Sequence, residues 1–210
     1  MSQPFTAPES AADVERYIRE NDVRFLFAQF VDMHGKPNAK LVPARLLDAL
    51  LEDGAGFAGF AAGEIGQQPH DPDLAAMPDV RSLTPLPWRP DVARLACDVW
   101  VEGEEWPYDP RTILRRQLER ARSMGYEFML GVELEYFLVR QLEDGSIEVA
   151  DRYDTLAKPC YDMAGLTRRY DFLTTVSRYC NGLGWGNYAN DHEDANGQFE
   201  QNFTYDDALV

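Results

Sequence analysis

The sequence contains few cysteines and no long apolar run. Its 210 residues include only three cysteines, Cys97, Cys160 and Cys180, without a C-x-x-C spacing, which favours neither a disulfide framework nor a zinc site. No stretch approaches about 18 consecutive apolar residues, and the opening MSQPFTAPES lacks a basic region followed by an apolar one. We therefore expect a cytoplasmic protein that is neither secreted nor embedded in a membrane.

Basic residues are also scarce. Lysine and arginine together number 20 against 36 aspartates and glutamates, which gives a net charge of -16. Such a surface repels phosphate backbones and anionic lipids, so we expect no nucleic-acid and no membrane partner. With 45% hydrophobic and 12% aromatic residues the chain can bury a core, and carboxylates gathered in a cleft would suit hard divalent cations.

The first half of the chain predicts a small α+β unit. Ser10 followed by Asp13 is a capping signal for a helix from about residue 11. The stretch RFLFAQFVDMHGKPNAKLVPA predicts a hairpin before a second helix. The glycine-rich GAGFAGFAA predicts a loop, and the proline-rich segment after it predicts irregular chain between short strands. The expected ranges are a strand over 23–31, a turn over 32–37, a return strand over 39–42, a helix over 44–51, a loop over 54–62 and a strand over 92–101.

The segment EGEEWPYDP predicts a domain boundary, so we expect one domain over residues 1–104 and a second over 105–210. The second domain should be an antiparallel sheet with helices. Its expected elements are a helix over 110–124, a strand over 131–139, a return strand over 147–149 and a helix over 165–181 that stops at GLGWGN.

The strand GVELEYFLV carries Glu133 and Glu135 one residue apart. Side chains alternate along a strand, so both carboxylates should lie on one face about 7 Å apart, where they repel by roughly 2 kcal/mol at an effective dielectric constant of 20. A strand with one solvated face is the ordinary interpretation. Because Phe137 and Val139 continue the glutamate face, we expect that face to be more than a water-exposed surface.

A second acidic cluster lies in NDHEDANGQFEQNF, where Glu193 and Glu200 are separated by an Asn-Gly turn signal. If each lies beside that turn, the two are neighbours across a hairpin; the alternative is an ordinary polar hairpin. Together with Glu133 and Glu135 they would form an oxygen-rich site for Mg²⁺ or Mn²⁺.

Other catalytic motifs are missing or out of context. GLGWGN follows a helix, which is the wrong order for a dinucleotide fingerprint, and no P-loop occurs. His192 lacks a second histidine four residues later, so a zinc-protease site is not indicated, and His34 and His70 are expected at the surface. No serine or cysteine lies beside a base in a recognisable setting, so nucleophilic catalysis has no support.

Taken in order, these segments resemble one family. GVELEYFLV resembles the glutamine synthetase strand that supplies two metal-binding glutamates, and HEDANGQFEQNFTYDDAL resembles its downstream motif. RFLFAQFVDMHGKPNAKLVPA resembles the family's N-terminal β-grasp hairpin, and WPYDPRTILRRQLERA resembles the linker and first catalytic helix. The resemblance implies a β-grasp domain followed by the first part of the catalytic domain.

The resemblance also implies an activity: ATP-dependent ligation of glutamate to ammonia or a small amine through γ-glutamyl phosphate. It implies that Glu135, Glu193 and Glu200 hold a metal near glutamate, and that Glu133 belongs to a metal nearer ATP. Tyr205 would contact the nucleotide, and Tyr161 would lie near the amine. Family members self-associate into large rings.

Two departures from the family qualify this expectation. Where the family has an aspartate that binds ammonium, this chain has Ala58, in a form that resembles the branch of type III-like glutamine synthetases and γ-glutamylmethylamide synthetases. An alkylamine such as methylamine is therefore a candidate substrate. Family members are also roughly twice as long, so we expect these 210 residues alone to lack a complete active site and ligase activity. The alternatives are a non-catalytic structural or regulatory relative, and a metal-dependent hydrolase.

Overall fold

The computed structural model describes residues 5–62 and 67–209, which form two compact units. One unit consists mainly of Ala7–Phe128, and the other mainly of Met129–Ala208. The units divide after the helix α3 (Pro110–Ser123), whereas the sequence places a domain boundary at residue 104. The helix α3 makes its contacts within the first unit. The division into domains over residues 1–104 and 105–210 stays a prediction.

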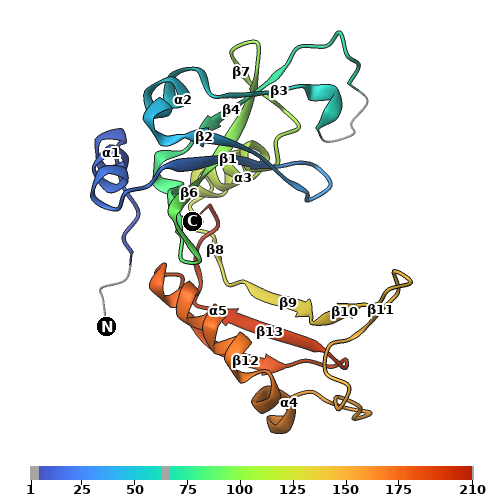
Figure 1. The fold of residues 1–210 in the computed structure, drawn as a ribbon. Coiled ribbons are helices and arrows are strands. Elements are labelled where there is room, and N and C mark those ends of the chain that lie inside the picture. Colours follow the sequence, from blue (N-terminus) through green and yellow to red (C-terminus); the bar gives the residue numbers. More distant parts are fainter. Residues whose placement is uncertain (1–4, 63–66, 210) are drawn as a thin grey trace. The chain divides into compact units, whose positions relative to one another are not determined.

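A mixed sheet forms the first unit (Figure 1). The strand order is β2-β1-β6-β4-β3, and β6 also pairs with two short strands, β5 and β7. β1 and β6 run parallel, while the other pairs are antiparallel. The strands are β1 (Phe25–Val31), β2 (Pro37–Pro43), β3 (Ala55–Phe57), β4 (Leu74–Pro78), β5 (Thr84–Leu86), β6 (Arg89–Val101) and β7 (Glu104–Glu105).

Local sequence signals explain where the helices of this unit begin. The helix α1 (Ala11–Glu20) starts at Ser10, whose Oγ accepts the Asp13 N–H at 3.2 Å, as the capping signal predicted. A 3-10 helix, η1 (Ala44–Leu46), precedes α2 (Leu47–Asp53), so the second predicted helix is confirmed in two pieces. α3 begins at the buried cap Asp109, followed by Pro110 in the first turn.

The stretch predicted as a loop over 54–62 is more regular than expected. It contains β3, which pairs with β4, and the 3-10 helix η2 (Gly59–Ala61). Gly54 has a φ of +72°, and a Cβ there would lie 2.6 Å from Met77 Sδ and 2.9 Å from the Ala76 carbonyl oxygen. Gly54 is therefore required for the close approach to β4, a tertiary cause that hydrophobic periodicity does not show.

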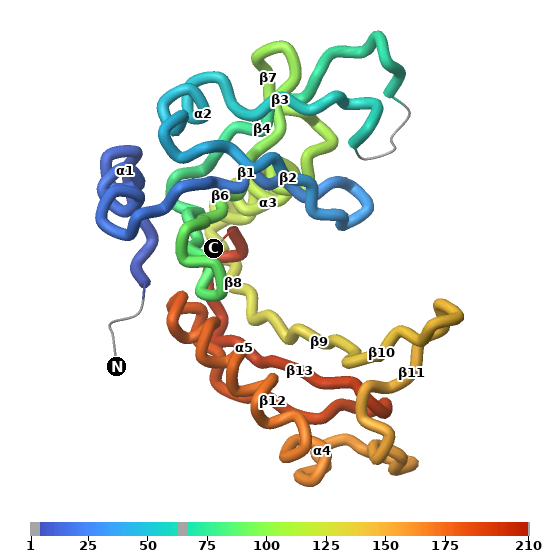
Figure 2. The backbone as a smooth tube through the Cα atoms, viewed as in Figure 1, coloured from blue at the N-terminus to red at the C-terminus, as the bar shows by residue number. Residues whose placement is uncertain are grey.

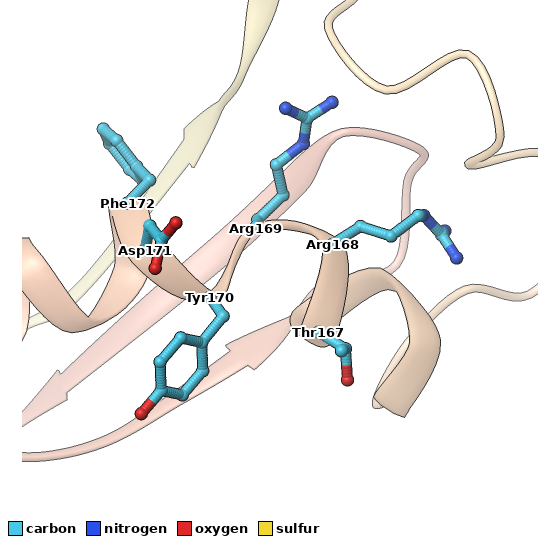
Figure 3. Close-up of a pocket in the computed structure, with 6 residues that line it drawn as sticks. All are labelled: Thr167, Arg168, Arg169, Tyr170, Asp171 and Phe172. Atoms are coloured by element: carbon cyan, nitrogen blue, oxygen red, sulfur yellow. The ribbon is translucent and has the colours of Figure 1, made fainter.

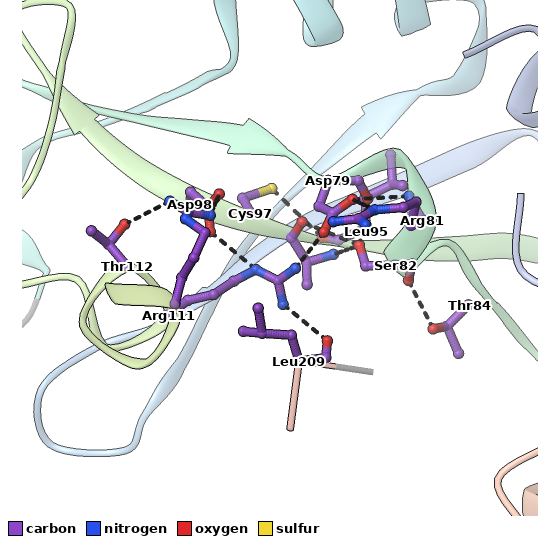
Figure 4. Close-up of polar contacts among 12 residues, drawn as sticks. Asp79, Arg81, Ser82, Thr84, Leu95, Cys97, Asp98, Arg111, Thr112 and Leu209 are labelled. Atoms are coloured by element: carbon purple, nitrogen blue, oxygen red, sulfur yellow. Dashed lines mark hydrogen bonds and ion pairs between the residues drawn. The ribbon is translucent and has the colours of Figure 1, made fainter. Parts of the chain in front are cut away.

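Arginines on α3 hold the helix to β6 (Figure 4). Arg111 lies 2.5 Å from Asp79 and 3.0 Å from Asp98, the second contact being an ion pair without hydrogen-bond geometry. Arg115 contacts Asp98 at 2.5 Å and Glu105 at 2.7 Å. Asp79 itself caps the 3-10 helix η3 (Val80–Ser82). Each carboxylate in this group therefore has an arginine partner.

A three-stranded antiparallel sheet, in the order β12-β13-β9, forms the centre of the second unit (Figure 2). Two strand pairs, β10–β11 and β8–β14, and the helices α4 and α5 complete it. The elements are β8 (Met129–Leu130), β9 (Glu133–Phe137), β10 (Val139–Gln141), β11 (Ile147–Val149), α4 (Met163–Arg168), α5 (Tyr170–Gly182), β12 (Asn187–His192), β13 (Gln198–Phe203) and β14 (Asp206–Asp207). None of the helices in the described residues combines the length and the apolar composition needed to cross a bilayer.

Two predicted elements of this unit are interrupted. GVELEYFLV is not one strand: β9 ends at Phe137, the Leu138 N–H donates to the Gly197 carbonyl at 2.8 Å, and Val139 opens β10. Val139 therefore does not continue the glutamate face, because the turn before β13 captures the backbone at Leu138. The return strand over 147–149 is confirmed as β11.

The helix predicted over 165–181 is two helices that break at Arg169, beside a shallow pocket lined by Thr167–Phe172 (Figure 3). Arg168 Nε lies 2.5 Å from one oxygen of Asp151, and Arg169 Nη2 lies 3.9 Å from the other. The two arginines at the break therefore share one carboxylate. The Arg169 N–H donates to the Leu166 carbonyl at 3.1 Å, a three-residue bond that tightens the end of α4.

Candidate metal centre

Carboxylates line one face of the β12-β13-β9 sheet. Asp191 pairs with Glu200 across β12 and β13, and Glu200 pairs with Glu135 across β13 and β9. Directly opposed residues share a sheet face, and residues two apart on a strand do so as well. Glu133 and Glu193, two residues from Glu135 and Asp191, therefore extend the same row. We call the five residues Glu133, Glu135, Asp191, Glu193 and Glu200 the acidic face.

Three members of the acidic face meet closely. Asp191, Glu193 and Glu200 each offer a carboxylate oxygen, and these oxygens lie within 4.8 Å of one another. The structure thus brings Glu193 and Glu200 together across the Asn-Gly turn, as the hairpin predicted. Cys160 also meets Glu193 and Asp194 within the same distance, at the edge of the face.

Glu133 and Glu135 lie apart from this trio and are exposed on β9. The sequence predicts more than a water-exposed surface for this face, but in the described residues Phe137 beside the two glutamates is 54% exposed. In the described residues β9 is an edge strand that packs through Tyr136 against Phe172, so the face opposite to the glutamates is the one that is covered. Glu135 is nevertheless held in the row: Gln198 Nε2 donates to its Oε2 at 2.5 Å.

Mutual repulsion and burial change the proton affinity of the acidic face. The pKa of Asp191 is raised by burial and then by the charges of Glu193, Glu133 and Glu135. Burial also raises the pKa of Glu200, which is only 8% exposed, and the contacts with Glu193 and Asp191 add to the increase. The Asn202 amide donates to Glu200 and partly offsets this.

The donor set fits a hard divalent cation. Within the described residues, none of the five carboxylates forms an ion pair with lysine or arginine. Clustered carboxylate oxygens are the ligands that Mg²⁺ and Mn²⁺ prefer, and a bound cation would offset the repulsion. The arrangement is therefore suited to binding a metal that neutralises phosphate charge.

Asp191 is the member that sequence reasoning missed. Its spacing from Glu193 is the same alternate-residue spacing that singled out Glu133 and Glu135. Reading the strand backward from the Asn-Gly turn would have placed it opposite Glu200. The family motif starts at His192, one residue after Asp191, and therefore does not include it.

The two tyrosines lie at opposite ends of the acidic face. Tyr161 donates its backbone N–H to the His192 carbonyl at 2.9 Å, next to Glu193, and its side chain is 73% exposed. The pKa of its hydroxyl is raised by Cys160 and then by Asp191 and Glu193. Tyr205 follows β13 and lies by Gly131, at the end where Glu133 begins β9; it is 72% exposed.

Comparison with known proteins decides the family. Residues 107–210 match the family model described as glutamine synthetase, catalytic domain. Over 202 residues the chain is 44% identical to the glutamate–methylamine ligase of Methyloversatilis universalis (strain ATCC BAA-1314 / DSM 25237 / JCM 13912 / CCUG 52030 / FAM5), which covers 96% of this chain and 46% of the relative. A solved structure of apo GmaS without ligand superimposes with a TM-score of 0.87 at 46% identity, covering 97% of this chain and 47% of that one. The chain belongs to the glutamine synthetase family.

Further glutamine synthetases agree with this assignment. The glutamine synthetase of Rhizobium leguminosarum bv. phaseoli is 42% identical over 197 residues, 94% of this chain and 44% of the relative. The Plasmodium falciparum glutamine synthetase has a TM-score of 0.78 at 18% identity and covers 99% of this chain and 46% of that one, which supports the fold alone. The chain spans less than half the length of these relatives.

Proposed function

We propose that the protein containing this chain is an ATP-dependent ligase that joins glutamate to ammonia or a small amine. The observation that carries the proposal is the acidic face, which lies inside the segment that matches the glutamine synthetase catalytic domain. One similar solved structure is a GmaS/ADP complex, which supports a nucleotide co-substrate.

In this proposal the acidic face holds divalent metal. Glu135, Glu193 and Glu200 would bind Mg²⁺ or Mn²⁺ near glutamate, and Glu133 would contribute to a metal nearer ATP. The metal would neutralise charge on the transferring phosphoryl group. The order along the sheet supports this division, because Glu133 lies at the Tyr205 end and Glu193 lies at the Tyr161 end.

The chemistry proceeds in two steps. The γ-carboxylate of glutamate attacks the γ-phosphorus of ATP and releases ADP, and the amine then attacks the acyl carbon, displaces phosphate and loses a proton. In this proposal Tyr205 contacts the nucleotide and Tyr161 lies near the amine. Tyr161 has a φ of +64°, a conformation that costs energy for a non-glycine residue and is common at binding sites.

Ala58 bears on the choice of amine. It caps η2 next to Phe57, at the position where the family carries an ammonium-binding aspartate. A methyl side chain neither accepts a proton nor pairs with ammonium, whereas it leaves apolar surface for an alkyl group. The identity to a glutamate–methylamine ligase supports the same substrate class. We therefore propose a small alkylamine such as methylamine as the preferred amine.

An assay of the full-length protein tests both parts. We expect ADP and phosphate release only when ATP, glutamate, an amine and Mg²⁺ or Mn²⁺ are all present, with a higher kcat/KM for methylamine than for ammonia. No amide product with either amine would refute the ligase, whereas a clear preference for ammonia would refute only the choice of amine. We also expect these 210 residues alone to be inactive.

The variant Ala58→Asp probes amine selection more directly. A new carboxylate at this position should favour ammonium, so we expect the ratio of kcat/KM for methylamine to that for ammonia to fall by roughly tenfold, about 1.4 kcal/mol of discrimination. Ala58→Ser is the matched control, because it adds a polar group without charge. An unchanged ratio in Ala58→Asp would show that this loop does not select the amine.

The finer features expected from the family belong to the same proposal. Residues 1–104 would form a β-grasp domain, and residues 105–210 would begin the catalytic domain. The full protein would self-associate into large rings and reside in the cytoplasm, where the three free cysteines of this chain stay reduced. Mass measurement of the purified full-length protein in solution tests the assembly.

A further inference from the structure

We propose that Asp154, acting through His192, is a positioning residue that fixes the hairpin carrying Glu193 and Glu200 in its metal-binding geometry. This inference rests on the proposed function, because it concerns the same metal site. Neither residue is one of the five carboxylates of the acidic face. The contacts that support this role lie on the opposite side of the hairpin from that face.

Asp154 and His192 form a fully enclosed pair. The side chains of His192 and Asp154 are 0% and 2% exposed, and His192 Nε2 lies 2.8 Å from Asp154 Oδ2. The centroids of the Phe199 and His192 rings lie 4.8 Å apart. A Cβ at Gly165 would lie 2.5 Å from Cδ2 of His192. Gly165 therefore lets α4 close over the ring, and His192 has no access to a ligand of its own.

Asp154 also holds the turn between β12 and β13. It comes from the irregular segment after β11, 38 residues before His192, and reaches across to the hairpin. Its Oδ2 accepts the Gly197 N–H at 2.5 Å, and its Oδ1 accepts the Asn196 side-chain amide at 3.0 Å. One carboxylate thus binds the last residue of β12 and the two turn residues before β13.

His192 connects the contacts of Asp154 to the backbone of Glu193. Its Nδ1 lies 2.9 Å from the Glu193 carbonyl oxygen, and the Glu193 N–H donates to the Gln198 carbonyl at 2.9 Å. Both backbone groups of Glu193 are therefore fixed. Because side chains alternate along the strand, the His192 ring points away from the acidic face while Asp191 and Glu193 point into it. The histidine thus acts on Glu193 through the backbone.

The same pair supports Tyr161. The His192 carbonyl accepts the Tyr161 N–H at 2.9 Å, where the Tyr161 backbone adopts its φ of +64°. A residue in this region of φ and ψ persists only when surrounding contacts hold it. Loss of the Asp154–His192 pair would therefore loosen one end of the metal site and the candidate amine contact together.

Metal binding by the full-length protein tests the proposal without an activity readout. Mn²⁺ is titrated, and the free ion is followed by its electron paramagnetic resonance signal, at a temperature where every variant is folded. We expect Asp154→Asn to weaken Mn²⁺ binding by about tenfold or more, as removal of groups that orient metal ligands does elsewhere. Asn196→Ala, which removes one Asp154 contact from the turn, should weaken binding to a smaller extent.

Leu173→Ala is the matched control. Leu173 is 4% exposed on α5 in the same unit, so its truncation lowers stability without touching the hydrogen bonds of the pair. We expect this variant to lose thermal stability and to keep the Mn²⁺ affinity of the wild type. A purely structural role for Asp154 predicts that Asp154→Asn behaves in the same way.

The outcomes separate this proposal from the proposed function. If the wild type binds no Mn²⁺, the metal site is wrong and the positioning role falls with it. If the wild type binds Mn²⁺ and Asp154→Asn binds it equally, only the positioning role is overturned. Should Asp154→Asn fail to fold, wild-type Mn²⁺ affinity in Asn196→Ala would overturn the proposal instead.

Discussion

The chain gathers carboxylates in two places, and the two groups differ in what lies next to them. On β6 and its neighbours, Asp79, Asp98 and Glu105 face the arginines of α3. On the acidic face, Asp191, Glu193 and Glu200 face one another. The negative charges of the first group are offset by arginines of the chain itself. Those of the second group have no such partner in the described residues and would be offset by a bound cation.

The pKa values follow this difference. Burial alone would raise the pKa of Asp79, but the Arg81 N–H and the charges of Arg111 and Arg81 bring it below the usual 3.8. The pKa of Asp191 is raised because burial and the neighbouring carboxylates act in the same direction. Paired carboxylates stabilise the fold when they are ionised. Ionised carboxylates of the acidic face repel one another and lower the stability of the fold until a cation binds.

Removing a partner from the paired group should have the largest effect. We expect Arg111→Ala to lower the free energy of unfolding by about 2–3 kcal/mol, because two half-buried carboxylates, Asp79 and Asp98, each lose one of their two arginine partners. Because the folded pKa of Asp79 is depressed, its ionised form stabilises the fold above pH 3.8, and this stabilisation disappears as the pH falls through the folded pKa. The difference in stability between the wild type and Arg111→Ala should therefore become smaller in acid.

Urea unfolding at pH 7 and at acidic pH measures this deficit. Arg120→Ala, an exposed position on the same helix, is the control and should change stability by less than about 0.5 kcal/mol. If Arg111→Ala is as stable as the control, the contacts of Arg111 do not hold α3 to β6.

Adding the missing charge to the acidic face should have an effect of similar size and opposite sign. At a Mn²⁺ concentration about a hundredfold above its Kd, the wild type should gain about 2.7 kcal/mol of stability. We expect Glu200→Gln to lose most of this gain, since Glu200 lies in the centre of the row. Thermal unfolding with Mn²⁺ or with a chelator measures it, and Glu143→Gln in an exposed turn is the control. An equal gain in both variants would contradict the proposed site.

Relieving repulsion without a metal should have the smallest effect. In the presence of a chelator, Asp191→Asn should raise stability by about 0.5–1 kcal/mol at pH 7, a figure already reduced for solvent screening. The pKa of Asp191 is higher in the folded state than in the unfolded state. Its ionisation therefore lowers stability when the pH is above the folded pKa, and this loss disappears as the pH falls below the unfolded pKa. Urea unfolding should show the gain shrinking toward pH 4; a gain independent of pH would point to a cause other than charge.

Sequence reasoning succeeded where the signal was local. The Ser10 cap, the β1–β2 hairpin and the Asn-Gly turn between Glu193 and Glu200 are encoded within a few residues. It failed where distant residues decide. The breaks at Leu138 and Arg169 lie where the chain contacts the distant residues Gly197 and Asp151. The contacts of His192 could not be predicted from the sequence, because its partner Asp154 is 38 residues away in a segment without periodicity.

The position of β9 at the sheet edge has a consequence for solubility. Leu134 and Phe137 are 50% and 54% exposed there, and an apolar edge strand is a template for pairing with a second chain. Glu133 and Glu135 place two negative charges on that edge, so two copies of β9 repel each other. Divalent metal neutralises that charge, and for this reason preparations of the isolated chain should aggregate more readily with Mn²⁺ than with a chelator.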